Sequence, residues 1–195
     1  MFATTNNDTA IQLLQTVGIT DTQLPVNLQT LATTDVRYLK DLKLNVTNSL
    51  GAATLSKKEA YLIGVAVAVN EKQAALQAGF EKLSQQEGAT DKEIAEAISC
   101  TSLMNANNVF YRFRHFVNKE FYSSTPAGIR MSIMASPVLG KEFFELLSLV
   151  ISALNGCEMC VTSHEEAVLK HGTEQQRVLD AVRLGAVLRS LAVLF

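Results

Sequence analysis

Two capping boxes mark the positions where helices begin in the first half of the chain. Ser56 is followed three positions later by Glu59. Thr90 and Glu93 repeat this spacing. In a capping box, the hydroxyl and the glutamate each accept a hydrogen bond from a backbone N–H that would otherwise be unpaired. Residues 57–69 are almost all apolar, so we expect the helix that follows the first box to be buried on every side.

The composition agrees with a helical globular protein. Apolar residues make up 48% of the 195 residues, and the chain has three prolines and no tryptophan. Amphipathic helices are predicted at 71–88, stopping at Gly88, and at 91–116. A chain of this length buries about 70% of its unfolded surface and needs no disulfides for stability. The sequence therefore predicts an all-α fold.

We expect one compact helical domain at 25–195, preceded by an N-terminal extension at 1–24. The extension begins with polar residues and continues as a short amphipathic run that ends at Gly18. We interpret this run as a loosely attached helix. Inside the domain, apolar residues recur at steps of three and four from 28 to 46, which predicts one helix before a loop at 47–56.

The helical pattern occurs twice, at about 55–104 and again at about 139–190. Each copy consists of a buried helix, an amphipathic helix, a glycine and a further helix, which indicates a duplicated helical unit. Two unrelated helical hairpins would explain the same pattern. The alignment makes these pairs: Glu59 with Glu145, Ala74 with Cys160, Ala78 with His164 and, after a two-residue gap, Gly88 with Gly172.

The stretch 145–164 has the spacing Glu-x11-Cys-x2-Cys-x3-His. The dipeptide Asn155-Gly156 predicts the end of one helix, because it supplies the positive φ that other residues resist. Cys157 therefore stands at or just inside the start of the next helix. At about 100° per residue, Cys160 lies about 60° from Cys157 around the helix axis, and His164 lies within about 20° of it. The two thiols and the imidazole share one face.

This position favours reactive thiols. Unpaired N–H groups and the positive end of the macrodipole stabilise a thiolate in the first helical turn. A Cys-x-x-Cys pair there has thiol pKa values below the free value of about 8.5, and the thiolate is the species that attacks peroxides and disulfides. A second sulfur one turn away can resolve the oxidised product. His164 and Glu145 are candidates for proton transfer.

Three other interpretations are open. Cys157, Cys160, His164 and Glu145 could bind zinc, although structural zinc sites usually draw on a second Cys or His pair, which the chain lacks. A structural disulfide is possible, but so short a loop removes little chain entropy. The cysteines could also be buried residues beside a capping histidine. The third cysteine, Cys100, stands alone in the sequence, and we expect it to be a small buried residue of the core.

Aromatic and basic side chains alternate at 110–116. The run superficially resembles a nucleic-acid-binding surface, but the helical spacing of Phe110, Phe113 and Phe116 favours a place in the core. We assign His115 a structural role. The formal net charge of −2 also argues against a nucleic-acid partner.

The sequence also favours a cytoplasmic protein with no membrane partner. The first ten residues lack the basic and apolar regions of a signal peptide. The most apolar stretch, 61–69, is about half as long as a membrane helix. Thiols stay reduced in the cytoplasm, where a Cys-x-x-Cys pair is more often catalytic than structural.

Four segments resemble the alkylhydroperoxidase D (AhpD) family. They are DLKLNV (41–46), NNVFYRFRHF (107–116), GIRMSIMASP (128–137) and FELLSLVISALNGCEMCVTSHE (144–165). The resemblance implies an all-helical fold with a duplicated unit and assembly as a homotrimer. It implies an antioxidant enzyme that reduces organic hydroperoxides and re-reduces an AhpC-type peroxiredoxin. Electrons would come from dihydrolipoamide on a lipoyl-bearing dehydrogenase-complex subunit, with no tightly bound cofactor and no metal.

The resemblance also implies a role for each residue of the motif. Cys160 would be oxidised to a sulfenic acid, and Cys157 would close an intramolecular disulfide that dihydrolipoamide reopens. Glu145 would act as a base toward Cys160, in a proton relay with His164. One position departs from the family pattern, because Met159 stands where a histidine is expected. A relay that needs that imidazole would be weakened here.

Two other functions remain as alternatives. A carboxymuconolactone decarboxylase-like enzyme would share the helical unit without needing two cysteines. A redox-sensing oligomeric scaffold would change its assembly on oxidation without consuming peroxide.

Overall fold

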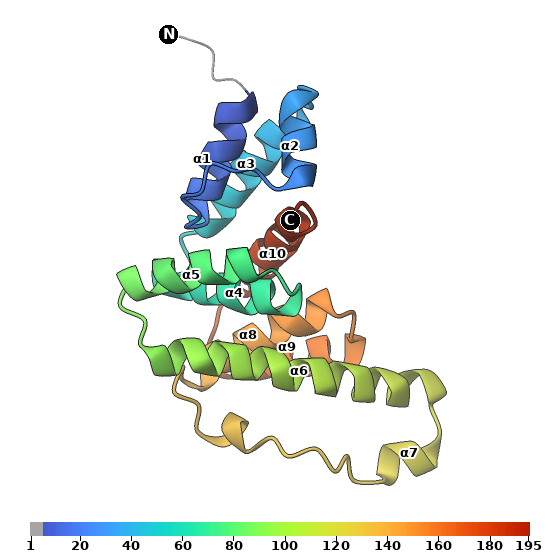
Figure 1. The fold of residues 1–195 in the computed structure, drawn as a ribbon. Helices are drawn as coiled ribbons and strands as arrows, with labels where there is room; N and C mark the ends of the chain where they lie inside the picture. Colours follow the sequence, from blue (N-terminus) through green and yellow to red (C-terminus); the bar gives the residue numbers. More distant parts are fainter. Residues whose placement is uncertain (1–5) are drawn as a thin grey trace.

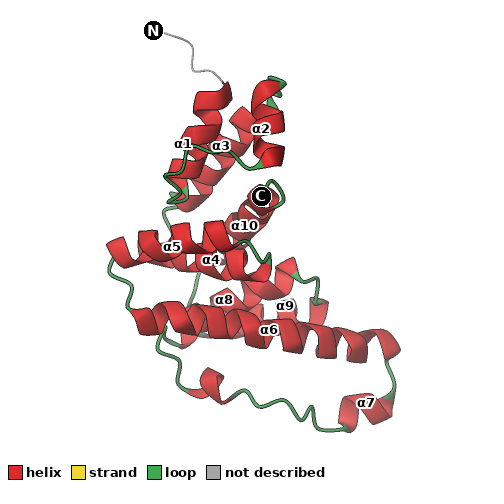
Figure 2. Ribbon diagram, in the orientation of Figure 1, coloured by secondary structure: helices red, strands yellow, loops and turns green. Residues whose placement is uncertain are grey.

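The computed structural model describes residues 6–195, and all regular structure within them is helical (Figures 1 and 2). The predicted all-α class is therefore confirmed. In chain order the elements are α1 (Asn6–Thr16), α2 (Val26–Thr33), α3 (Tyr38–Leu50), α4 (Lys57–Asn70), α5 (Ala74–Gln86), α6 (Asp91–Val117), α7 (Glu120–Ser124), the 3-10 helix η1 (Ser132–Ala135), α8 (Lys141–Leu154), α9 (Glu158–Lys170) and α10 (Gln175–Ala192).

The helices α4, α5 and α6 recur in the same order as α8, α9 and α10. Each helix of the second set begins 84 residues after its counterpart, as the starts at Lys57 and Lys141 illustrate. The residues before α5 and α9 also have nearly the same backbone angles, with φ −103° and ψ 91° at Gln73 and φ −99° and ψ 91° at Cys157. The first two helices of each unit are thus alike in length and local geometry, whereas α6 has 27 residues and α10 has 18.

This repeat corrects part of the predicted alignment. At a constant offset of 84 residues, Leu76 rather than Ala74 occupies the place of Cys160, and Phe80 rather than Ala78 that of His164. The predicted pairs were two residues out of register because they were anchored on two glutamates, whereas the helix boundaries place Tyr61 opposite Glu145. In the first unit, large apolar side chains occupy the places of the second cysteine and the histidine.

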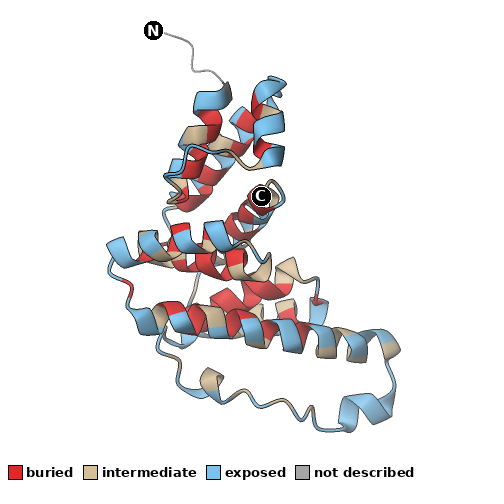
Figure 3. Cartoon of the chain, in the orientation of Figure 1, coloured by how far each residue is buried: buried red, intermediate tan, exposed pale blue. Residues whose placement is uncertain are grey.

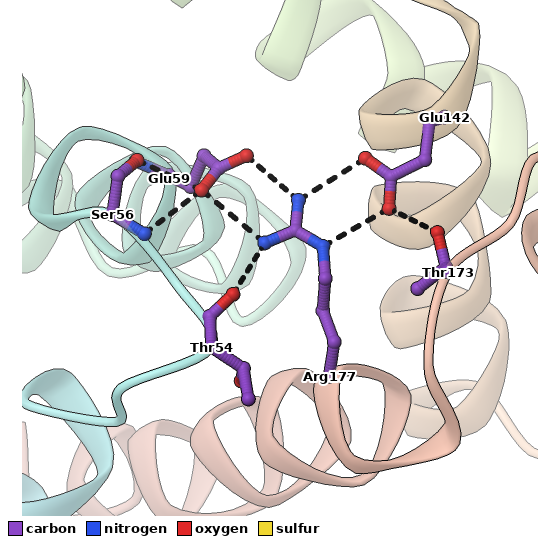
Figure 4. Close-up of polar contacts among 6 residues, drawn as sticks. All are labelled: Thr54, Ser56, Glu59, Glu142, Thr173 and Arg177. Carbon is purple, nitrogen blue, oxygen red and sulfur yellow. Dashed lines mark hydrogen bonds and ion pairs between the residues drawn. The ribbon is translucent and has the colours of Figure 1, made fainter.

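An arginine on α10 joins the buried helices of the two units (Figure 4). Arg177 Nη2 lies 2.7 Å from Glu59 on α4, and Arg177 Nε lies 3.0 Å from Glu142 on α8. Its Nη1 also donates to the carbonyl oxygen of Thr54 at 2.7 Å. The arginine side chain is only 16% exposed, so water screens these ion pairs weakly.

The equivalent ion pair in the first unit has its charges exchanged. Lys58 Nζ lies 2.8 Å from Glu93 Oε1. These two residues stand 84 positions before Glu142 and Arg177, which form the pair of the second unit. Both capping boxes, at Ser56 and at Thr90, are present as predicted.

The N-terminal helix packs firmly, contrary to the expectation of loose attachment. Leu13 and Val17 of this segment are fully buried in the same hydrophobic core as α4. Gly18 has φ 81°, and a Cβ there would lie 2.4 Å from the carbonyl oxygen of Gly79, so the turn that follows α1 meets α5 backbone to backbone. Residues 1–5 of the predicted extension lie outside the described residues.

The segment predicted as one helix at 28–46 is two helices. The break follows α2, where Asp35 takes φ 52°. The second helix, α3, continues to Leu50 and so shortens the predicted loop. Helices α1, α2 and α3 form a layer over the end of the bundle where the C-terminus lies (Figure 1).

The far end of α6 extends beyond the body of the molecule (Figure 3). Phe113 is 44% exposed and Phe116 is 74% exposed, so their predicted place in the core is wrong. Phe110 is half-buried, with the guanidinium of Arg114 4.5 Å from its ring centre. No helix within residues 6–195 has the length and apolar character needed to cross a bilayer.

Candidate active site

The turn between α8 and α9 places Cys157 at the start of a helix, as predicted. Gly156 takes φ 68°, which suits glycine, and Cys157 is the residue that precedes the first helical position of α9. The N–H of Cys157 donates to the carbonyl oxygen of Ser152 at 3.1 Å, which closes the end of α8. The first cysteine is thus held by backbone bonds from two helices.

Amide side chains fix this turn from the outside. Asn155 Nδ2 donates to Asn108 Oδ1 at 2.9 Å, and Asn155 Oδ1 accepts from Asn70 Nδ2 at 3.1 Å. Arg112 Nη1 donates to the carbonyl oxygen of Asn155 at 2.5 Å. Residues from α4 and α6 therefore hold the residue two positions before Cys157, which gives the thiol pair a rigid base.

The two cysteines of the motif are joined in a disulfide, with an S–S distance of 2.08 Å. Cys157 is fully buried, whereas Cys160 is 6% exposed and lines a pocket. A molecule entering this pocket therefore meets Cys160, and Cys157 is reached only through it.

The histidine and the glutamate of the motif form a close pair between α9 and α8. His164 Nδ1 lies 2.6 Å from Glu145 Oε2, with the two side chains 12% and 18% exposed. Because this bond occupies Nδ1, the other ring nitrogen is the one available to a group in the pocket. All four predicted site residues therefore meet in one place, as two linked pairs.

The pocket beside Cys160 has a volume of about 320 Å³ and is mainly apolar. Cys160 and His164 form one side of it, together with Ser163. The other lining residues come from α6, from the segment before α8 and from the start of α9: Asn107, Tyr111, Met131, Met134 and Met159. A ligand with an apolar body would fit among the three methionines, whose flexible thioethers adapt to irregular shapes.

A second, more open pocket adjoins the first and shares Met159 and Ser163 with it. Here His115 Nε2 lies 3.5 Å from Glu158 Oε2, and the histidine side chain is 46% exposed. The structural role expected for His115 is therefore limited to this exposed contact.

The third cysteine is separate from the site, as expected. Cys100 is buried, and its Sγ lies 3.3 Å from Ser148 Oγ. Burial raises the pKa of its thiol to about 12, so it stays protonated at neutral pH. Across residues 6–195 there is also no group of three or more His, Cys, Asp or Glu side chains placed to hold a metal ion.

The sequence predicted that the four residues of the motif come together, but not most of the pocket wall. Met134 lies in η1 and Met131 directly precedes it, so their place beside Cys160 depends on how the connection between α7 and α8 folds back. Asn107 belongs to a segment that resembles the AhpD family, but its place in the pocket was not predicted. A signal was present, since Asn107 and Asn108 continue the spacing of three and four residues set by Ala97, Cys100 and Met104 on the buried face of α6.

Comparison with known proteins places this arrangement in a family. The model of the carboxymuconolactone decarboxylase family matches residues 122–193, which include α8, α9 and α10. Proteins named alkyl hydroperoxide reductase AhpD match a much longer part of the chain. The one from Rhodopseudomonas palustris is 36% identical over 156 residues, covering 80% of this chain and 86% of its own length.

Two further relatives with the same name show similar agreement. The protein from an Anaeromyxobacter species is 38% identical over 154 residues, covering 79% of this chain and 83% of its own length. The protein from Rhizorhabdus wittichii is 35% identical over 164 residues, covering 80% and 89% of the two chains. The chain therefore belongs to the AhpD family, as the resemblance of its motifs indicated.

Proposed function

We propose that this protein is an alkyl hydroperoxide reductase that uses Cys157 and Cys160 as a redox-active pair. The observation that carries the proposal is the position of Cys160, which is bonded to Cys157 and lines an apolar pocket beside His164. The names of the relatives support peroxide as the substrate.

In the first step, the Cys160 thiolate attacks the terminal oxygen of the hydroperoxide. An S–O bond forms, the O–O bond breaks, and Cys160 becomes a sulfenic acid while the substrate leaves as an alkoxide. The alkoxide takes a proton and departs as the alcohol. The His164–Glu145 pair is placed to supply this proton, because the ring nitrogen that does not contact Glu145 is available to the pocket.

In the second step, the Cys157 thiol attacks the sulfenic sulfur and water leaves. The product is the Cys157–Cys160 disulfide. Two electrons then come from dihydrolipoamide through thiol–disulfide exchange, which returns both cysteines to thiols and leaves oxidised lipoamide. Attack on Cys160 is favoured in this exchange, since it is the sulfur that the pocket exposes. No tightly bound cofactor takes part.

The proton relay of this chain rests on the Glu145–His164 pair. Met159 is 41% exposed and borders both pockets, so a thioether stands where the family pattern has an imidazole. A thioether can neither give nor take a proton at neutral pH. The methionine instead extends the apolar wall.

The proposed partners are an AhpC-type peroxiredoxin and a lipoyl-bearing subunit of a dehydrogenase complex, in the cytoplasm. The proposed assembly is a homotrimer. Support for an assembly comes from the exposed apolar side chains along the end of α6 and in α7: Val109, Phe113, Phe116, Phe121 and Tyr122. The ring of Tyr122 lies 5.2 Å from that of Phe113 and 5.4 Å from that of Phe121, and exposed apolar side chains that gather in this way are typical of an interaction site.

A coupled assay tests the proposed function. NADH consumption would be followed with lipoamide, a lipoamide dehydrogenase and an organic hydroperoxide, with and without an AhpC-type peroxiredoxin. We expect turnover that requires this protein and is absent with Cys160→Ser. Turnover seen only with the peroxiredoxin would make it primarily a reductase, and no turnover in either case would overturn the lipoyl-dependent proposal.

A decarboxylase is the second candidate, because the matched family model is that of the carboxymuconolactone decarboxylases. Such chemistry needs no thiol pair. Carboxymuconolactone decarboxylation that persists unchanged in Cys157→Ser and Cys160→Ser would favour it over the peroxidase.

A further inference from the structure

The side-chain oxygen of Asn107 is a hydrogen-bond acceptor without a donor, and it indicates how the pocket binds its substrate. Asn107 on α6 is 5% exposed and lines the same pocket as Cys160 and His164. Its Nδ2 lies 3.2 Å from Met131 Sδ. Its Oδ1 is buried and accepts no hydrogen bond from any of residues 6–195.

The chemistry of the neighbour fixes which end of the amide is free. A thioether sulfur has no hydrogen to donate and can only accept, so the NH2 group of Asn107 must face Met131. The carbonyl oxygen is then the atom left over. Rotating the amide by half a turn would set two acceptors against each other, with the sulfur facing the oxygen.

A buried acceptor without a partner is costly, and few occur in native proteins. The adjacent amide shows the contrast, because Asn108 donates to Ser152 Oγ and accepts from Asn155, both at 2.9 Å. Asn107 thus differs from its neighbour in having an unused acceptor inside the pocket. A ligand that brings an O–H group would satisfy it.

We infer that Asn107 Oδ1 binds the terminal O–H of an organic hydroperoxide, whose apolar part lies among Met131, Met134 and Tyr111. This inference rests on the proposed function and deepens it. The terminal oxygen carries the only proton of the –OOH group and is also the oxygen that the Cys160 thiolate attacks. One hydrogen bond therefore selects the reactive end of the substrate and holds it in the pocket that Cys160 lines.

The same acceptor serves the product of the first step. When the O–O bond breaks, the terminal oxygen and its proton stay on Cys160 as the sulfenic hydroxyl. Asn107 remains able to accept from that hydroxyl until Cys157 displaces it as water. The alkoxide has no O–H group, so it cannot donate a hydrogen bond to Asn107 Oδ1 until it is protonated.

The test separates the two half-reactions. Pre-reduced enzyme is mixed with cumene hydroperoxide, and disulfide formation is followed; independently, reduction of the disulfide by dihydrolipoamide is followed without peroxide. For Asn107→Ala we expect the peroxide rate constant to fall about threefold to tenfold, the effect of one hydrogen bond. The rate of disulfide reduction is expected to stay within twofold of wild type.

Ser102→Ala is the control. It removes an exposed polar side chain from the same helix, outside the pocket, and we expect both half-reactions to match wild type. Equal peroxide rates for wild type and Asn107→Ala would overturn the inference alone, and so would parallel losses in both half-reactions. A wild-type enzyme that does not react with peroxide would overturn the proposed function and the inference together.

A measurement on the wild-type protein keeps the inference testable if the variant does not fold. The product alcohol of cumene hydroperoxide donates an O–H, whereas its methyl ether cannot. We expect the concentration of alcohol that halves the rate of the peroxide reaction to be at least about threefold lower than that of the ether. This factor is the lower end of the range expected for one hydrogen bond. An ether that inhibits as strongly as the alcohol would contradict the role of Asn107.

Discussion

His164 Nδ1 lies 2.6 Å from Glu145 Oε2, and this contact orients the imidazole. A carboxylate beside one ring nitrogen favours the tautomer that carries the proton there. In the proposed mechanism, the second ring nitrogen exchanges protons with the substrate. Glu145 acts through the histidine in this account, so its charge matters as well as its hydrogen bond.

Glu145→Gln keeps a side chain of the same size but removes this charge. We expect the rate of peroxide reduction to fall at least about tenfold, because proton transfer by a positioned side chain supplies a factor of that size or more. Stopped-flow measurement of disulfide formation with an organic hydroperoxide would give both rates. An unchanged rate would show that the glutamate has no part in the relay.

The grouping of the motif residues could be predicted because their spacing is local. Cys157, Cys160 and His164 lie on one helix, where position along the chain determines position around the axis. Asn107 and Met134 could not be predicted in the same way. They reach the pocket only through the packing of α6 and of an irregular segment against α9.

Among whole helices, α10 holds the two units together through Arg177. Removing this guanidinium leaves Glu59 and Glu142 partly buried without their cation. We expect Arg177→Ala to lower the free energy of unfolding by about 2–4 kcal/mol, since breaking a buried ion pair leaves an uncompensated charge. Urea denaturation would measure this value.

Lys170→Ala is the control for this prediction. Lys170 pairs with Glu166 at 4.0 Å, but the two side chains are 79% and 61% exposed. Exposed ion pairs of this kind contribute about 0.5 kcal/mol or less. Equal effects of the two substitutions would contradict the special role of Arg177.

The same ion pairs predict how stability depends on pH. Burial by itself would raise the pKa values of Glu59 and Glu142. Hydrogen bonds from Arg177, with those from Ser56 to Glu59 and from Thr173 to Glu142, together with the charge of Arg177, outweigh burial and hold both pKa values below the ordinary value of 4.5. A carboxyl whose pKa is lower in the folded state gives stability that is present above its unfolded pKa and lost as the pH falls through its folded pKa.

We therefore expect the free energy of unfolding to decrease as the pH falls from about 5 to about 3. In Arg177→Met the decrease should be smaller, because the pKa values of the two carboxyls are then no longer lowered by a neighbouring positive charge. Denaturant titrations at several pH values would measure both slopes. Identical slopes in the two proteins would contradict the assignment of acid sensitivity to this cluster.

The prediction of whole helices succeeded where local signals were strong. The capping boxes at Ser56 and Thr90 marked the starts of α4 and α6, and the Asn155-Gly156 turn marked the end of α8. The break at Asp35 was missed because the apolar spacing continues across it, and because the left-handed conformation there belongs to a residue other than glycine.

For the molecule as a whole, the exposed end of α6 is the main departure from expectation. Phe113 and Phe116 have helical spacing suited to a core, but α6 is longer than the body that it packs against (Figure 3). Periodicity alone says which side chains share a face, not whether another element covers that face. In the proposed homotrimer, a neighbouring chain would cover it.

Phe116→Asp tests this assembly. Light scattering should give three times the chain mass of 21.2 kDa for wild type and a lower mass for the variant, because a charge would be buried at the interface. Val26→Asp changes an equally exposed apolar residue on α2 and should leave the mass unchanged. A monomeric wild type would overturn the trimer, and a trimeric Phe116→Asp would overturn this choice of surface.

The stoichiometry of a single turnover tests whether Cys157 and Cys160 reduce the peroxide. Pre-reduced enzyme is mixed with one equivalent of cumene hydroperoxide, and mass spectrometry follows the cysteines while chromatography follows the alcohol. We expect one alcohol and one Cys157–Cys160 disulfide per chain in wild type, and neither product in Cys160→Ser. Alcohol formed without the disulfide, or formed equally by Cys160→Ser, would contradict the dithiol mechanism.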